Sequence, residues 1–200
     1  MELDDIIDFD NIPVSNNGTK KNRLICIIGR TGSGKDTFGR YINYKYNILP
    51  VVSYTTRPMR DSEKDGVEHY FITEEEYQSQ YKDIKKMAYT EINGYRYFTT
   101  YEQINKCKDD KYYYIIDPKG LKYLRENITE EDNIELLVIY VRCTDKLRFD
   151  RYVSRSEAKS YTDTFLSRDR AENEQFSEFE DNMFSLCNII INTDHLDFRI

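Results

Sequence analysis

The sequence predicts an α/β fold with a parallel core sheet and helices on both of its faces. Short apolar, β-branched runs alternate along the chain with stretches whose apolar residues recur at helical spacing, as in sheets joined by crossover helices. The clearest example is residues 23–44, where an apolar run is followed by a glycine-rich loop and then by an amphipathic helical pattern. The 200 residues suit one domain, with room for small inserted subdomains.

The glycine-rich loop runs from Gly29 to Thr37 and reads G-R-T-G-S-G-K-D-T. Gly29 and Gly34 are five positions apart and Lys35 follows, which matches the phosphate-binding P-loop in all but its eighth position. Glycines are needed because the backbone must fold back so that several N–H groups point into one concavity beside a helix N-terminus. We therefore expect a nucleoside triphosphate to be bound by Gly29, Thr31, Gly32, Ser33, Gly34, Lys35, Asp36 and Thr37.

The eighth position of this loop is Asp36, where the pattern has a serine or threonine whose hydroxyl holds Mg²⁺. A carboxylate is a good ligand for a hard cation, so Asp36 is a candidate magnesium ligand. It also brings negative charge close to the phosphates, and it therefore needs the metal beside it.

Further core strands and helices follow in alternation. Together with residues 23–28, four apolar runs predict a five-stranded parallel sheet, and they lie at residues 51–53, 111–116, 134–141 and 187–192. Helical patterns occupy residues 100–107, 119–127, 145–156 and 163–181, and the last two are charged and rich in arginine.

Residues 57–99 are more polar and predict a small α/β insert. Thr73 followed by three glutamates is a capping box that opens a helix through Tyr81. Asn93-Gly94 is a turn signal between two short strand-like runs.

Composition limits the partners and the compartment. The formal net charge of −7 argues against nucleic acid or an acidic membrane surface as the main partner. No run is apolar enough to span a bilayer and no signal peptide is recognised, so we expect a cytoplasmic protein. The four cysteines lack C-x-x-C spacing, which indicates reduced thiols and no zinc site. Residues 1–22 interleave acidic and apolar residues, which predicts a mobile acidic tail or a short, loosely docked helix.

Two arginines three residues apart, Arg57 and Arg60, follow the expected second core strand and could fork around one phosphate. The segments that carry them and the later motifs resemble the guanylate kinase family, in the same order and over most of residues 23–192. The most specific of these segments is Ser53-x-Thr55-Thr56-Arg57-Pro58-x-Arg60, continued by Glu63-x-Asp65-Gly66-Val67-Glu68-His69-Tyr70-Phe71. The others are Gly94-x-x-Tyr97-x-Thr99, Ile116-Asp117-Pro118-Lys119-Gly120 and Arg151-x-x-x-Arg155.

The resemblance implies a P-loop kinase that phosphorylates a nucleoside monophosphate, GMP or dGMP, with ATP and Mg²⁺. It implies one domain over residues 23–200, with a monophosphate-binding insert at 57–99 and a helical lid at about 145–175. It assigns the base to Ser53, Thr99 and Asp117, the monophosphate to Arg57, Arg60, Tyr97 and His69 or Tyr70, and ATP with the transferring phosphoryl group to Arg151, Arg155 and Arg168 or Arg170. Catalytic roles fall on Lys35, Arg57, Arg151 and Arg168.

One position in the substrate segment departs from the family pattern. The family's phosphate-binding tyrosine falls on His69, and Tyr70 is adjacent to it. Either side chain could donate to a phosphate, and alternation along a strand puts His69 on the same face as Phe71.

Two further departures concern carboxylates. The family's guanine-reading glutamate falls on Ala88, and Glu91 is the nearby acid that could replace it. The family has two acids at the end of a core strand, where this chain has Ile115 and Asp117. The acid lost at Ile115 and the acid gained at Asp36 could be connected, because both positions are expected near the metal and the phosphates; two unrelated substitutions are the alternative.

Two other functions remain open beside the GMP kinase. One is a nucleoside or deoxynucleoside monophosphate kinase with another base preference. The other is a non-catalytic guanylate-kinase-like binding module, which would have no use for an intact P-loop and lid arginines. An unrelated P-loop ATPase or GTPase is disfavoured because it would leave the arginine segment unexplained and no Asn-Lys-x-Asp motif is present.

Overall fold

The computed structural model describes residues 9, 22–61, 63–105, 111–154 and 161–196. Its core is a five-stranded sheet in the order β2-β7-β1-β8-β9, and every neighbouring pair is parallel. The strands are β1 (Asn22–Ile28), β2 (Leu49–Pro50), β7 (Tyr112–Ile115), β8 (Ile134–Arg142) and β9 (Ile189–Asn192). The predicted α/β class and five-stranded parallel core are confirmed.

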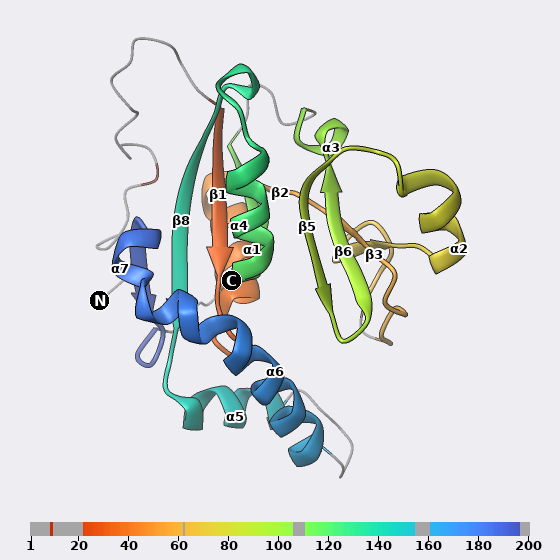
Figure 1. Ribbon diagram of the computed structural model, residues 1–200. Helices are drawn as coiled ribbons and strands as arrows, with labels where there is room; N and C mark the ends of the chain where they lie inside the picture. The colour runs from red at the N-terminus through yellow and green to blue at the C-terminus, as the bar shows by residue number, and fades with distance from the viewer. Residues whose placement is uncertain (1–8, 10–21, 62, 106–110, 155–160, 197–200) are drawn as a thin grey trace.

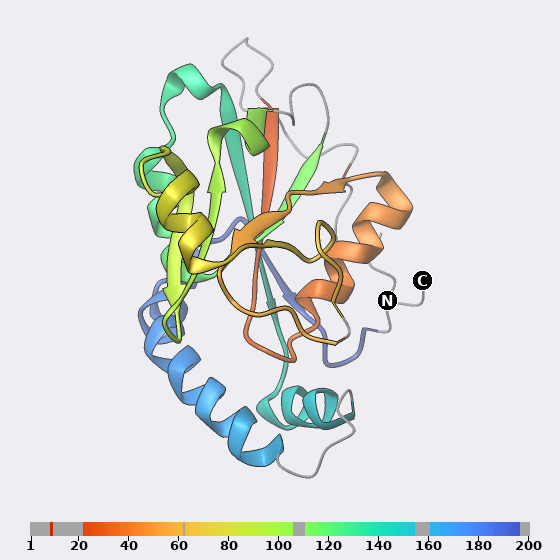
Figure 2. The ribbon, with the colours of Figure 1, turned by 90° about the vertical axis from the view of Figure 1, so that its right-hand side faces the viewer.

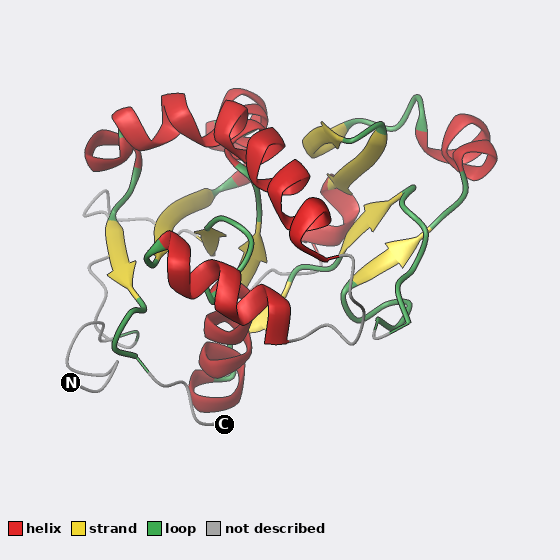
Figure 3. Cartoon of the chain, turned by 90° about the horizontal axis from the view of Figure 1, so that it is seen from below, coloured by secondary structure: helices red, strands yellow, loops and turns green. Residues whose placement is uncertain are grey.

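Helices cover both faces of this sheet, as Figure 3 shows. Phe38 and Ile42 of α1 (Lys35–Tyr46) join one apolar cluster with alternate residues of β1. Leu124 of α4 (Pro118–Asn127) and Phe176 of α6 (Tyr161–Asp181) join the cluster on the opposite face. Other helical elements are α3 (Tyr101–Asn105), α5 (Asp145–Ser154), α7 (Met183–Leu186) and a 3₁₀ turn at Glu130–Asp132.

A second, four-stranded sheet lies beside the core (Figures 1 and 2), in the order β4-β3-β6-β5. Its strands are β3 (Ser53–Thr55), β4 (His69–Phe71), β5 (Lys86–Ile92) and β6 (Tyr95–Thr100). The expected Asn93-Gly94 turn joins β5 to β6, with φ of 53° and 78°, and Gly suits its left-handed position. The Thr73 capping box is present and opens α2 (Glu74–Glu76), which continues as a π-helical turn at Tyr77–Tyr81.

The prediction of a core strand at residues 51–53 is wrong. The core strand is only Leu49–Pro50, and the Val51 N–H still donates to the Tyr113 carbonyl at 2.8 Å. The chain then crosses to the second sheet as β3, where Tyr54 stacks on Phe98. Arg57 and Arg60 therefore follow a strand of the second sheet rather than a core strand.

Most other boundaries agree within a few residues. The last core strand begins at Ile189 instead of residue 187, and helix α5 ends at Ser154. The expected helix at 100–107 is seen as Tyr101–Asn105, and Cys107 lies outside the described residues. Cys26, Cys143 and Cys187 are free thiols, as expected. No helix in the described ranges is long and apolar enough to cross a bilayer.

The expected N-terminal tail contributes one described residue, Phe9. Its side chain is 2% exposed and packs against the rings of Phe38 and Tyr46. Lys111 Nζ donates to the Phe9 carbonyl at 3.1 Å. At this one position the segment before β1 is packed into the core, while the other residues of 1–21 lie outside the described ranges.

Candidate functional site

The glycine-rich loop joins the carboxyl end of β1 to the first turn of α1, as the sequence predicts. Gly32 and Gly34 have φ of 80° and 94°, a conformation that favours glycine. A Cβ atom on Gly32 would lie 2.5 Å from the Arg148 carbonyl oxygen, so the loop also packs tightly against α5. The loop thus ends at a helix N-terminus, where N–H groups and the helix dipole favour an anion.

Lys35 and Asp36 form the first turn of α1. Lys35 Nζ donates to Asp36 Oδ2 at 3.1 Å, and the two side chains are 20% and 54% exposed. Among the residues that the structure describes, no group of three or more His, Cys, Asp or Glu side chains could hold a metal ion. Mg²⁺ is often bound through one or two carboxylates together with phosphate and water.

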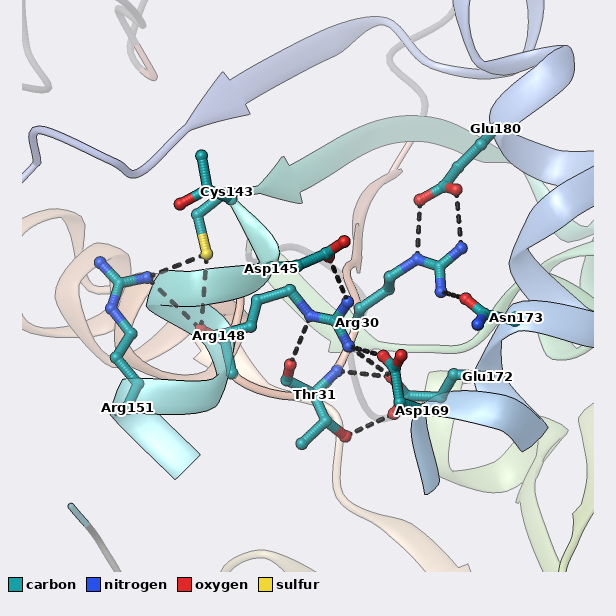
Figure 4. A network of polar contacts seen from close by, with 12 residues as sticks. Arg30, Thr31, Cys143, Asp145, Arg148, Arg151, Asp169, Glu172, Asn173 and Glu180 are labelled. Carbon is teal, nitrogen blue, oxygen red and sulfur yellow. Dashed lines mark hydrogen bonds and ion pairs between the residues drawn. The ribbon is translucent and has the colours of Figure 1, made fainter. Parts of the chain in front are cut away.

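Arg151 lies against the loop from the side of α5. Its guanidinium donates to the Ser33 carbonyl at 3.2 Å and to the Thr193 hydroxyl and carbonyl at 2.9 and 3.0 Å. It also lies 3.5 Å from Cys143 Sγ (Figure 4). The structure thus places Arg151 beside the loop backbone, bonded to protein oxygens.

The other expected lid arginines are less fully placed. Arg155 lies outside the described residues. Arg168 lies in α6, and its side chain is outside the described part of the structure. Arg170 is on the same helix and exposed.

Two arginines that the sequence reading did not single out connect the loop to the C-terminal helices. Arg30 forms a bidentate pair with Glu180, at 2.9 and 2.7 Å (Figure 4). Its guanidinium also lies over the Phe176 ring, 5.1 Å from the centroid. Arg148 is buried and donates to the Thr31 carbonyl at 2.9 Å. In Figure 1, α5 and α6 both lie at the end of the core sheet where β1 leads into the loop.

The second sheet turns one polar face toward the site. Cross-strand partners share a face, and the register pairs Ser53 with His69, Thr55 with Tyr97, and Ala88 with Thr99. The opposite face is aromatic, with Tyr54 against Tyr70, Tyr81 and Phe98. The expected base-contacting and phosphate-binding residues Ser53, His69, Tyr97 and Thr99 therefore lie on one face, and Tyr70 lies on the other.

Arg57 and Arg60 converge on one carboxylate, that of Glu63. Glu63 Oε1 accepts from Arg57 Nη2 at 2.8 Å and from Arg60 Nη1 at 3.3 Å. Tyr97 OH accepts from Arg57 Nε at 3.2 Å. Burial raises the pKa of the Glu63 carboxyl, but the hydrogen bonds from Arg57 and the Arg60 backbone outweigh it and hold that pKa below its usual range. The two arginines therefore share one anionic group, the Glu63 carboxylate.

His69 lies between the arginine cluster and Ser53. Its Nδ1 is 2.9 Å from the Ser53 hydroxyl, and its ring meets those of Phe71 and Tyr97 edge-on. Burial, with the nearby charge of Arg57, lowers the pKa of His69 to about 4. The imidazole is therefore neutral near pH 7 and can act as a hydrogen-bond partner but not as a cation.

Asp117 caps helix α4, where its Oδ1 accepts from the N–H groups of Lys119 and Gly120 at 3.0 and 3.1 Å. Burial raises the pKa of this carboxyl. The hydroxyls of Thr90 and Thr99 are buried close to this region; that of Thr90 acts on the pKa of Asp117 and that of Thr99 on the pKa of Tyr114. Alternation puts Thr90 on the same face as Ala88.

The structure does not bring Glu91 to this group. Glu91 is one residue past Thr90, so its side chain leaves β5 on the opposite face. There it forms an ion pair with Arg96, its cross-strand partner. The opposite orientation of Glu91 could have been predicted from the sequence, because a residue three positions from Ala88 along a strand lies on the other face.

The comparisons with known proteins all identify members of one family as similar to this chain. The family model described as "Guanylate kinase" matches residues 21–199. The guanylate kinase of Neisseria meningitidis serogroup A is 31% identical over 121 residues, covering 59% of this chain and 59% of that protein. The one of Malacoplasma penetrans is 29% identical over 124 residues, covering 60% and 63%.

A solved structure shows the same fold. The crystal structure of guanylate kinase from Anaplasma phagocytophilum superposes with a TM-score of 0.57 at 16% identity, covering 90% of this chain and 80% of that chain. The aligned part spans about three fifths of the length of the first curated relatives, at 59% and 63%. The family match covers nearly the whole sequence, and the chain therefore belongs to the guanylate kinase family.

Proposed function

We propose that the protein transfers the terminal phosphoryl group of ATP to a nucleoside monophosphate, GMP or dGMP, giving GDP or dGDP. The observation that supports this proposal most is the presence of two anion sites in the chain. One is the glycine-rich loop at the N-terminus of α1, and the other is the pair Arg57 and Arg60, which together hold the Glu63 carboxylate. A donor phosphate at the loop and an acceptor phosphate at the arginines would meet between the two sites.

In this reaction the chain supplies positioning and charge. Lys35 and the loop N–H groups would hold the terminal phosphates of ATP, and Arg57, Arg60 and Tyr97 the acceptor phosphate. That phosphate is already ionised at neutral pH, so no general base is required. Mutual repulsion of the two anions is offset by these cations, and neutral His69 needs no part in proton transfer.

We further propose that the second sheet with its connecting segments, at 57–99, is the monophosphate-binding insert, and that α5 and α6 belong to a lid over residues 145–175. Arg151, Arg155 and Arg168 would then act on ATP and the transferring group. Closure of such a lid would exclude water and so protect ATP from hydrolysis. The protein's partners would be these small nucleotides.

The residues present fit one magnesium ion carried by ATP. Asp36 is half-exposed in the first turn of α1, and no protein cage competes for the cation within the described residues. Mg²⁺ would be held by Asp36, directly or through water, and would neutralise phosphate charge. Asp36 also holds Lys35 in the present structure, so it can release the lysine when phosphate arrives.

Replacing Asp36 tests this arrangement. We expect Asp36→Ser to strengthen metal-free ATP binding about tenfold and to reduce its dependence on Mg²⁺, because a negative charge beside the phosphates is removed. Calorimetric titration of ATP with and without Mg²⁺ measures both effects. An unchanged metal dependence would mean that the Asp36 side chain does not reach the cation.

The function itself is tested by an ATP-dependent phosphorylation screen over GMP, dGMP, AMP and UMP. Turnover of GMP or dGMP supports the proposal. Absence of turnover with all four, in protein that still binds GMP, would instead identify a non-catalytic binding module.

One observation favours a second candidate, a kinase with weaker base discrimination. Ala88 offers no carboxylate where the family pattern has one, and Glu91 faces the other way. The site-facing polar groups near Ala88 are the hydroxyls of Thr90 and Thr99. Hydroxyls can both donate and accept, so they reject a mismatched base less strongly than a carboxylate does.

We expect Thr90→Val to lower kcat/KM for GMP about tenfold, because it removes a hydroxyl without changing the side-chain volume. The matched control is Glu91→Gln, the next residue on the opposite face, which should leave the preference among GMP, dGMP, AMP and UMP unchanged. A selectivity that depends on Glu91 and not on Thr90 would reverse this assignment of the two faces.

A further inference from the structure

Arg148 is the most enclosed charged side chain around the loop, with 3% of it exposed. Its guanidinium is shared among four partners (Figure 4). Nε donates to the Thr31 carbonyl at 2.9 Å and Nη1 to Asp145 at 2.9 Å. Nη2 pairs with Asp169 and lies 3.5 Å from Glu172, both on α6. One arginine of α5 thus connects the loop backbone to two acids of the next helix.

Glu172 reaches the same loop residue from the other helix. It accepts a hydrogen bond from the Thr31 N–H at 2.9 Å and another from the Thr31 hydroxyl. Thr31 is therefore held through its carbonyl by Arg148 and through its N–H and hydroxyl by Glu172. The backbone of Arg148 also packs against Gly32, so that the loop is fixed at two successive residues.

Arg148 is the cation that the structure pairs with Asp169 and Glu172. Asp169 and Glu172 are only 25% and 21% exposed, so water solvates them poorly. Asp145 is 91% exposed and needs no protein cation. Removing one partner of a buried ionic group is costly because the remaining charge is left uncompensated. Here the remaining charges would be carboxylates beside a loop that must accept phosphate anions.

We propose that Arg148 is a positioning residue for ATP, which fixes the loop at Thr31 and offsets part of the negative charge of Asp169 and Glu172 beside the anion site. This rests on the proposed use of ATP at the loop. It adds a residue to those that the family resemblance assigns to ATP, which are Arg151, Arg155 and either Arg168 or Arg170. The ring of Phe165 on α6 lies over the guanidinium, with its centroid 5.7 Å from Arg148 Cζ.

The test is the ATP affinity of four proteins, measured by calorimetry: wild type, Arg148→Gln, Glu172→Gln and the double variant. We expect Arg148→Gln to bind ATP at least about tenfold more weakly, which is 1.4 kcal/mol. Adding Glu172→Gln should restore the affinity to within about threefold, since glutamine keeps an acceptor for Thr31 but carries no charge. The loss should shrink at 1 M salt, where the Debye length falls to about 3 Å. A purely structural role would give neither the rescue nor the salt dependence.

A matched control is Arg23→Gln, because Arg23 forms a half-buried pair with Glu135 at the opposite end of β1. Its ATP affinity should equal that of wild type. If circular dichroism shows that Arg148→Gln does not fold, Arg148→Lys is measured in its place. We expect its ATP affinity to be about threefold weaker than that of wild type, because a lysine cannot reach all four partners.

Three outcomes are distinguishable. Wild type that binds no ATP would overturn the proposed function and this inference together. Folded Arg148→Gln, or Arg148→Lys in its place, that binds ATP as wild type does would overturn the inference. If Arg148→Gln binds ATP weakly and the added Glu172→Gln does not restore the affinity, the proposal that Arg148 offsets the charge of the acids would be overturned.

Discussion

Lys35→Ala is expected to lower turnover by a factor of about 10² to 10³ while leaving the fold intact. The lysine acts on charge that develops at the transferring phosphoryl group, so its loss should appear mainly in kcat. Its interaction in the present structure is an ion pair with Asp36, a half-exposed side chain, and such pairs contribute little to stability. We therefore expect steady-state rates to show a large loss of turnover in this variant, while its thermal unfolding curve stays close to that of wild type.

Lys45→Ala is the matched control for Lys35→Ala. Lys45 is in the last turn of the same helix, α1, and its removal changes the net charge equally. We expect its turnover to match wild type. Near-normal turnover in Lys35→Ala would mean that the glycine-rich loop does not hold the phosphoryl donor.

Local patterns predicted those parts of the fold that neighbouring residues determine. The P-loop with its strand and helix, the Asn93-Gly94 turn and the Thr73 capping box all depend on short-range backbone geometry. The switch between sheets after Pro50 was not predictable in this way. Two very short strands follow each other directly, and tertiary pairing alone decides that Leu49 joins the core while Ser53 joins the second sheet.

The environment of the charged helices depends on contacts that are distant in the sequence. From the sequence, Arg148 is one more charged residue on a helix that would be expected to face solvent. In the structure it is hydrogen-bonded to Thr31, which is 117 positions away. Glu172 and Thr31 are 141 positions apart. Such residues become visible only when α5 and α6 are packed against the loop. The face of Glu91, by contrast, was available from the period of two along a strand.

Arg57→Gln is expected to raise the KM for the monophosphate about 100-fold and to leave the KM for ATP nearly unchanged. Truncating one member of a buried, hydrogen-bonded charge cluster costs about 2–5 kcal/mol, and about 2.7 kcal/mol corresponds to 100-fold. Arg57 is bonded to Tyr97 and Glu63 on the face that carries Ser53 and His69, and the structure shows no bond from it to the loop that would hold ATP among the described residues.

Arg96→Gln controls for the loss of an arginine from the same sheet. Arg96 is also paired with glutamates, Glu74 and Glu91, but on the opposite face. Its substitution should leave both KM values as in wild type, even if the insert loses some stability. An Arg57→Gln variant whose KM rises for ATP and not for the monophosphate would place this arginine cluster on the donor. Equal effects of Arg57→Gln and Arg96→Gln would point to destabilisation of the sheet instead of phosphate binding, because the two arginines share the sheet and not the face.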